Sequence, residues 1–378
     1  MAMDRLFVLM KEKGASDMFL AVNSPIHLKI NGKLVPINQQ KMDNATIMTL
    51  LGEAVPASRL QELERDNELN IGIPVSGVGS FRLSAFRQRS SISAVLRYIP
   101  HTIPEIATLN VPPQLNDLIM AKRGLLLVVG STGSGKSTTI ASLLDYRNEH
   151  IAGHILTLEE PIEFLFRNKR SIVNQREVGV DTETLTVSLK NALRQAPDCI
   201  MIGEIRDRET MAAAMAYAQS GHLVVSTLHA SNSYRALNRI IGFFPIENRP
   251  ALLQDLASTV TAIVSQRLVP AIGGGLIPAV EVLLNTSHVA DLIEDGEISQ
   301  IHNAIEKSLS PGSQTFEQAL LQLIRDGKVT QDDAIANADS ASNLFWMINN
   351  TATGKPVSPD PELAVPDGPT FTEFTLDT

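Results

Sequence analysis

The chain has 378 residues and a formal net charge of −9 at neutral pH. An acidic chain gains no overall electrostatic attraction to nucleic acid or to an anionic membrane surface, so we expect no nucleic-acid partner. Its single cysteine excludes an internal disulfide and a cysteine-rich zinc site. No apolar run approaches the roughly 20 residues of a membrane-spanning helix, and the amino terminus lacks a signal-peptide core. We therefore expect a cytoplasmic protein that contacts a membrane only through partners.

Residues 1–99 are predicted to form a small α+β domain. An amphipathic helix containing Leu6, Phe7 and Met10 precedes strands at MFLAVN and IHLKING, and further strands are predicted at LNIGIPV, SFRLSAFRQR and SISAVLRYI. The proline-bearing segment that follows cannot hold a long helix or a central strand. We therefore expect residues 100–114 to be a linker that lets two domains move relative to one another.

Residues 115–345 are predicted to form a second domain in which strands alternate with helices. Short apolar runs at LLLVVG, HILTLEE, CIMIGE and HLVVSTLH are typical of strands that a parallel sheet buries on both faces. From Ser233 onward we expect a helical region, broken by a hairpin at IGGGLIP. Residues 346–378 are acidic, proline-rich and poor in large apolar side chains, so we expect a disordered tail.

The segment GSTGSGKS fits the phosphate-loop pattern G-x-x-x-x-G-K-[ST], with a predicted strand before it and a helix after it. Glycines let backbone N–H groups turn around a phosphate, and the helix N-terminus adds positive potential. A chance match is the alternative, and the flanking strand and helix argue against it. Lys136 is expected to reach the β and γ phosphates of a bound nucleotide, and Ser137 to ligate Mg²⁺. The predicted nucleotide-binding residues are Gly130, Ser131, Thr132, Gly133, Ser134, Gly135, Lys136, Ser137 and Thr138.

Acidic residues and histidines stand at the ends of the predicted strands. A carboxylate at such an end can bind Mg²⁺ through water or polarise the attacking water. An isolated glutamate or histidine is more often structural, but here several strand ends carry polar groups toward one phosphate site, which favours function. The residues in question are Glu159, Glu160, Glu163, Glu204, His222 and His229.

At these residues the chain resembles a known family. GSTGSGKS, LTLEEPIEF, MIGEIRD and GHLVVSTLHASNS are similar to the Walker A, Asp-box, Walker B and His-box motifs of secretion-superfamily ATPases. These hexameric enzymes drive type IV pili and type II secretion. The pilus-retraction branch, the PilT/PilU family, is the most similar, through GASDMFL, GSFRLSAF and IVNQREVGVDT as well. The resemblance implies a PAS-like N-terminal domain joined to a RecA-like P-loop ATPase domain.

The resemblance also implies roles for individual residues. Glu163 matches the catalytic glutamate, the general base for water, and Glu204 matches the Walker B glutamate, which acts on Mg²⁺ through water. His229 and His222 match the His-box histidines, which couple the nucleotide site to the subunit interface.

Two N-terminal arginines, Arg82 and Arg97, match residues that approach the nucleotide when the N-terminal domain closes. They would neutralise charge that develops on the γ-phosphate. The alternative is that both belong to the solvent-exposed face of an alternating strand.

The chain departs from the family pattern in three places. Glu160 stands where the Asp box usually has aspartate, and HVADLIEDG, with Asp291, replaces an AIRNLI-type helix needed for retraction. The tail also extends past the usual end of PilT. Together these departures favour a PilU-like protein.

The function implied is a hexameric ATPase motor that hydrolyses ATP with Mg²⁺ to power type IV pilus retraction and twitching motility. We expect it to be a PilU-like accessory to a PilT-type ATPase, at the inner-membrane base of the pilus beside a platform protein. A non-autonomous or scaffold subunit with weak ATPase activity is the alternative. A pilus-extension or type II secretion ATPase would carry a four-cysteine zinc motif, and a nucleic-acid motor a basic or aromatic platform.

Overall fold

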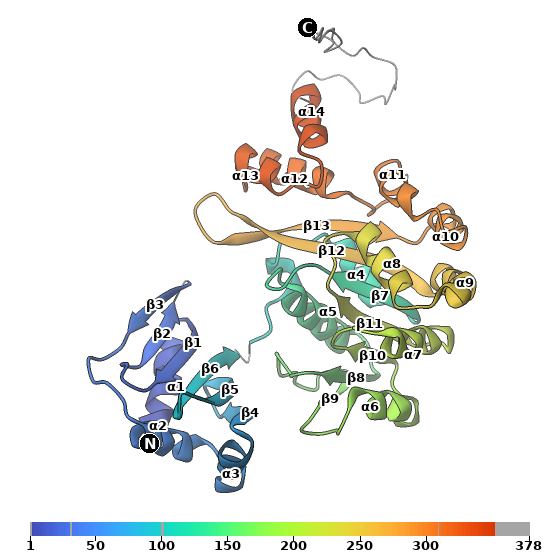
Figure 1. Cartoon of the computed structure of the whole chain (residues 1–378). Coiled ribbons are helices and arrows are strands. Elements are labelled where there is room, and N and C mark those ends of the chain that lie inside the picture. The colour runs from blue at the N-terminus through green and yellow to red at the C-terminus, as the bar shows by residue number, and fades with distance from the viewer. Residues whose placement is uncertain (1, 31, 100–101, 309, 352–378) are drawn as a thin grey trace, which may run out of the picture. The chain divides into compact units, whose positions relative to one another are not determined.

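The computed structural model describes residues 2–30, 32–99, 102–308 and 310–351. The chain has an α/β fold with two sheets, one of six strands and one of seven (Figure 1). By its internal contacts the chain divides into two compact units. The larger contains Met1–Leu268 and Ile277–Thr315, and the smaller contains Val269–Leu276 and the chain from Phe316 onward.

The first sheet is antiparallel, with the strand order β3-β2-β1-β6-β5-β4. Alternate apolar residues of its strands pack against helices, as when the Phe81 ring stacks on Phe7 with centroids 4.1 Å apart. Some of the intervening positions are polar and exposed, among them Arg82 and Arg97. The elements are α1 (Ala2–Glu12), β1 (Ala15–Ala21), β2 (His27–Ile30), β3 (Lys33–Pro36), α2 (Asn44–Ala54), α3 (Ala57–Asp66), β4 (Glu68–Val75), β5 (Gly79–Gln88) and β6 (Ser91–Ile99).

The second sheet has the order β13-β12-β7-β11-β10-β8-β9, and β7 through β12 pair in parallel. Every residue of the central strand β7 is buried, because helices cover both faces of the sheet. The strands are β7 (Gly124–Val129), β8 (His154–Glu159), β9 (Ile172–Glu177), β10 (Cys199–Ile202), β11 (Leu223–Leu228), β12 (Val260–Pro270) and β13 (Leu276–Leu284).

Successive residues of β7 belong to two different cores. Leu125 and Leu127 pack with the helices from α6 to α11, whereas Leu126 and Val128 pack with α4 and α5. The sheet is therefore sandwiched between two helical layers. Its helices are α4 (Gln114–Ile119), α5 (Lys136–His150), α6 (Leu185–Ala192), α7 (Arg208–Gln219), α8 (Ser233–Gly242), α9 (Arg249–Thr259), α10 (Ser287–Glu294) and α11 (Ile301–Glu306).

The expectation of a helical region from Ser233 onward is wrong in one part. Two long strands, β12 and β13, lie in this region and extend the sheet beyond β7. The segment VTAIVSQRLVP is rich in β-branched and apolar residues, which favours a strand. The predicted hairpin is present, and Gly273–Gly275 form its turn with positive φ angles.

The smaller unit contains the helices α12 (Phe316–Arg325), α13 (Gln331–Ala336) and α14 (Ala341–Thr351). Helix α14 corrects the predicted boundary of the tail, because it continues past residue 346 to Thr351 through the apolar run LFWMI. The rest of that predicted tail, residues 352–378, lies outside the described residues. Of the helices in the described segments, none is long and apolar enough to cross a membrane.

Candidate nucleotide-binding site

The phosphate loop joins the end of β7 to the start of α5. Gly133 and Gly135 adopt φ angles of 79° and 86°, which favour glycine, and α5 begins directly after Gly135. A Cβ atom on Gly130 would collide with the backbone oxygen of Gln266 and the Ser134 hydroxyl. The glycines of the motif therefore permit a tight loop whose N–H groups and following helix N-terminus form an anion site.

Lys136 is only 8% exposed and lies inside this loop. Its Nζ donates hydrogen bonds to the carbonyl oxygens of Gly130 and Ser131, at 2.9 and 2.8 Å. Burial lowers the pKa of Lys136, and the charges of Glu204 and Glu163 act in the opposite direction. The loop thus fixes a cation that faces two carboxylates.

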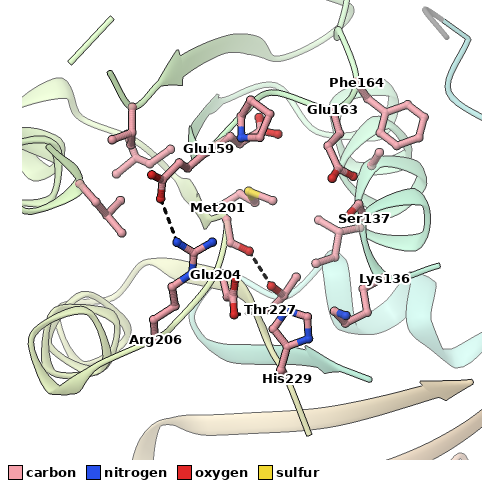
Figure 2. Close-up of a pocket in the computed structure, with 18 of the residues that line it drawn as sticks. Lys136, Ser137, Glu159, Glu163, Phe164, Met201, Glu204, Arg206, Thr227 and His229 are labelled. Atoms are coloured by element: carbon pink, nitrogen blue, oxygen red, sulfur yellow. Dashed lines mark hydrogen bonds and ion pairs between the residues drawn. The ribbon is translucent and has the colours of Figure 1, made fainter. Parts of the chain in front are cut away.

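Glu204 follows β10 and has a cationic or polar partner on each oxygen (Figure 2). Arg206 Nε donates to Oε2 at 2.9 Å, and His229 Nε2 lies 3.3 Å from Oε1. Arg206 also donates to Glu160, with NH1 3.1 Å from Oε2. The hydrogen bond from Arg206 to Glu204 raises the pKa of Arg206. Arg206 therefore balances two carboxylates that would otherwise repel each other.

Glu159, the last residue of β8, is buried, and burial raises the pKa of its carboxyl group. The carboxyl group accepts hydrogen bonds from Thr157 Oγ1 at 2.6 Å and Gln175 Nε2 at 3.3 Å, and it also bonds the backbone of Glu163. Glu159 therefore holds the loop that carries Glu163. The Glu163 side chain itself is exposed and points toward Ser137 (Figure 2).

Two side chains of β9 hold the same loop on either side of Glu163. Glu177 Oε2 accepts from the Ile162 amide at 3.1 Å, and Gln175 Nε2 donates to the Phe164 carbonyl at 2.8 Å. Sequence reasoning assigned no role to Gln175 or Glu177. The available signal was their place in IVNQREVGVDT, one of the segments that carry the family resemblance.

These side chains line a cavity of about 420 Å³, a size typical of small-ligand sites. It combines the Lys136 ammonium, the Ser137 hydroxyl and several carboxylates. Hydroxyl and carboxylate oxygens are the ligands that Mg²⁺ prefers, so the donor set fits that ion. The predicted residues that line the cavity are Arg82, Thr132, Gly133, Lys136, Ser137, Glu159, Glu160, Glu163, Glu204 and His229.

His222 is not brought to this cavity. His222 immediately precedes β11 and His229 immediately follows it. The two histidines therefore lie at opposite ends of the parallel strands, His222 at the amino ends and His229 at the carboxyl ends. The ring Nδ1 of His222 lies 3.1 Å from the Ser220 hydroxyl, at the end of α7.

The two predicted arginines are neighbours on the antiparallel sheet. Arg82 of β5 pairs in register with Arg97 of β6, and Arg97 pairs with Asp17 of β1. Arg97 Nε lies 2.9 Å from Oδ1 of the buried Asp17, and Arg97 is not among the described residues that line the cavity. Arg82 therefore lines the site, and Arg97 is held beside it by a carboxylate.

Comparisons with known proteins show which family the chain belongs to. The model of the family "Type II/IV secretion system protein" matches residues 3–329. The type IV pilus ATPase PilU of Pseudomonas aeruginosa is 45% identical over 92% of this chain and 91% of its own length. The type IV pilus retractation ATPase PilT of that organism is 34% identical over 91% of this chain and 100% of its own length.

Two solved structures show the same fold. The pilus retraction motor PilT with bound ADP superposes with a TM-score of 0.84 and 37% identity, over 90% of this chain and 99% of that one. The ATPase DotB of Legionella pneumophila gives a TM-score of 0.76 and 27% identity, over 88% and 94%. On the family match and these full-length relatives, the chain belongs to the Type II/IV secretion system protein family.

Proposed function

We propose that this chain is an ATPase motor that hydrolyses ATP to power type IV pilus retraction, as a PilU-like accessory to a PilT-type motor. The observation that carries the proposal is one cavity in which Lys136 faces Glu163 and Glu204 beside a phosphate loop. The names and full-length coverage of the PilU and PilT relatives support the pilus as the object of the work.

The phosphate loop binds the nucleotide. Its backbone N–H groups and the N-terminus of α5 attract phosphate oxygens, and Lys136 exchanges its bonds to the Gly130 and Ser131 carbonyls for charge-assisted bonds to phosphate. Charge-assisted hydrogen bonds are stronger than bonds to neutral carbonyls, so the exchange favours binding.

Ser137 and, through water, Glu204 would hold Mg²⁺, which when bound neutralises negative charge on the phosphate oxygens. Glu163 accepts the proton of the attacking water. A base must stand within hydrogen-bond reach of that water. The bonds from Glu159, Gln175 and Glu177 fix the backbone around Glu163 at the cavity and thereby fix the position of the base.

Arg82 supplies a positive charge for the γ-phosphate as the bond breaks, and Arg97, held by Asp17, supports it from the neighbouring strand. His229 links this chemistry to α8, because it contacts Glu204 and lies in the loop before that helix. His222, at the other edge of the sheet, would serve the subunit interface.

The proposal extends to architecture and assembly. The antiparallel sheet with its helices is a PAS-like domain of residues 1–99, and residues 100–114 link it to a RecA-like ATPase domain from residue 115. Six copies form a ring at the cytoplasmic base of the pilus, in contact with a PilT-type ATPase and an inner-membrane platform protein. The complete coverage of PilT by this chain supports a motor of the same build.

A second candidate is a scaffold subunit with weak ATPase activity that supports another motor. The observation that favours it is helix α10, which carries Asp291 where an AIRNLI-type helix has its arginine-asparagine pair.

Turnover of Mg-ATP by the full chain, with the oligomer mass measured on the same samples, separates the two candidates. We expect a hexamer whose turnover is lost in Glu163→Gln and retained in Glu64→Gln, an exposed control on α3. Rings that bind ATP but turn it over only weakly or not at all would contradict the motor and leave the scaffold.

A further inference from the structure

Gln266 lies next to the phosphate loop although it is far from it in the sequence. In the pairing of β12 with β7, Ser265 stands opposite Val129, the last residue before the loop. Gln266 therefore follows at the point where the loop leaves the sheet. Its side chain is 3% exposed, and a Cβ atom on Gly135 would lie only 2.7 Å from its Nε2.

Both ends of the buried amide have a partner at the phosphate loop or the helix that follows it. Nε2 donates to the Ser134 carbonyl at 2.8 Å, and Oε1 accepts from Thr139 Oγ1 at 2.9 Å. A donor and an acceptor on opposite ends fix the orientation of the amide. The side chain thereby connects the loop to the first turns of α5.

The residues on either side of Gln266 hold the loop that carries His229. Ser265 Oγ donates to Glu281 Oε1 at 2.8 Å, and the same oxygen accepts from the Ser233 amide at 2.7 Å and the Ser233 hydroxyl at 2.6 Å, at the start of α8. Arg267 NH2 donates to the Ser231 carbonyl at 3.1 Å. Three consecutive residues of β12 thus contact two loops of the site.

We propose that Gln266 is a positioning residue that holds the phosphate loop in its nucleotide-binding shape, and that Ser265 and Arg267 tie this shape to the His229 loop. The proposal rests on the nucleotide site of the proposed function. The peptide plane that carries the Ser134 carbonyl also carries the Gly135 N–H on its opposite side, so the bond to Gln266 fixes the direction of that N–H in the loop. Without this anchor the loop samples other shapes. The apparent affinity for nucleotide then falls in proportion to the fraction of molecules whose loop keeps the binding shape.

The test compares full-length wild type with Gln266→Met, which keeps the length of the side chain and removes both hydrogen bonds. Thr139→Val removes only the hydrogen bond to Oε1. Gln314→Met is the matched control, because Gln314 Nε2 donates to the Val280 carbonyl at 2.7 Å and Gln314 does not line the cavity among the described residues. Titration calorimetry gives the Mg-ADP affinity, steady-state turnover gives KM and kcat for Mg-ATP, and melting gives Tm.

We expect Gln266→Met to weaken Mg-ADP binding and raise KM by about tenfold, with kcat within about twofold, because bound nucleotide restores the loop. Thr139→Val should move the same quantities in the same direction by less, and it decides the question if Gln266→Met does not fold. Gln314→Met should lower Tm alone.

A lower Tm with unchanged Mg-ADP affinity and KM in both site variants would make Gln266 merely structural and overturn the proposal. A loss of kcat at saturating ATP with unchanged KM would overturn it too, because Gln266 would then act in the chemical step. If wild type binds Mg-ADP but does not turn over ATP, the proposed function fails, while the comparison of Mg-ADP affinities still tests Gln266.

Discussion

His229 Nε2 lies 3.3 Å from Glu204 Oε1, so the strand end of β11 touches the strand end of β10 directly at the candidate site. The other oxygen of Glu204 accepts from Arg206 at 2.9 Å, and Arg206 continues to Glu160. Four side chains from three strand ends therefore form one chain of polar contacts. A change at any of them is felt by Glu204, which the proposed mechanism places at Mg²⁺.

Replacement of Arg206 by methionine should weaken Mg-ADP binding. The two carboxylates Glu160 and Glu204 would lose their shared cation, and their charge would oppose the phosphates. Because Arg206 and Glu160 are more than half exposed, at 58% and 57%, we expect only about a twofold to fivefold loss of affinity. Calorimetry measures it, with Arg65→Met, an exposed arginine on α3, as control. An unchanged affinity would show that the bridge is dispensable.

Replacement of Lys136 by methionine should abolish nucleotide binding and raise the Tm of the protein measured without nucleotide. Burial lowers the pKa of Lys136, so the charged amine is disfavoured in the folded state, and a lysine shifted downward makes stability rise as pH rises toward its ordinary pKa. Methionine removes this cost. Melting curves with and without Mg-ADP test both parts. A lower Tm, or a Tm that still rises with Mg-ADP, would contradict the prediction.

Replacement of Glu159 by glutamine should flatten the dependence of stability on pH. Burial raises the pKa of Glu159 in the folded state, so the folded protein binds more protons than the unfolded chain between the ordinary and the raised value. The contribution of the protonated Glu159 carboxyl group to the free energy of unfolding is fully present below the ordinary pKa. It is lost as the pH rises through the raised pKa. The Tm of wild type relative to Glu159→Gln should therefore fall as the pH rises above the ordinary pKa of a glutamate. If Tm depended on pH in the same way for wild type and Glu159→Gln, the prediction would be wrong.

Replacement of Arg82 by glutamine should lower kcat for Mg-ATP by about tenfold to a hundredfold and leave Mg-ADP affinity within about twofold. An arginine that acts on charge developing at the γ-phosphate contributes to the transition state more than to product binding. Arg87→Gln is the matched control, because Arg87 is an exposed arginine of the same strand. Equal turnover in the two variants would show that Arg82 is an ordinary solvent-exposed strand residue with no role in hydrolysis.

The phosphate loop and its flanking strand and helix could be predicted because their chemistry is local. Eight consecutive residues, GSTGSGKS, specify the turn, the cation and the helix start. The same holds for the ends of β10 and β11, because His229 directly follows β11 and Glu204 stands two residues after the last residue of β10.

The supports of the site could not be predicted, because they are contacts between distant segments. Gln266 reaches Ser134 across 132 positions, and its strand was expected to be helical. Glu159 looks like another acid for the nucleotide, and only the tertiary structure shows it buried and bonded to the Glu163 loop. Periodicity reports which face of an element is apolar; it does not report which loop a polar side chain meets.

The row of Arg82, Arg97 and Asp17 across β5, β6 and β1 has a mechanical consequence. The pleat keeps a fixed spacing between the backbones of Arg82 and Arg97, and the Asp17 carboxylate holds the Arg97 side chain. Beyond what a change of side-chain rotamer provides, the distance from these arginines to a bound nucleotide would be adjusted by moving the sheet as one body. The rate of ATP hydrolysis would in that case depend on the position of the sheet. A load that pulls on the sheet would therefore change that rate.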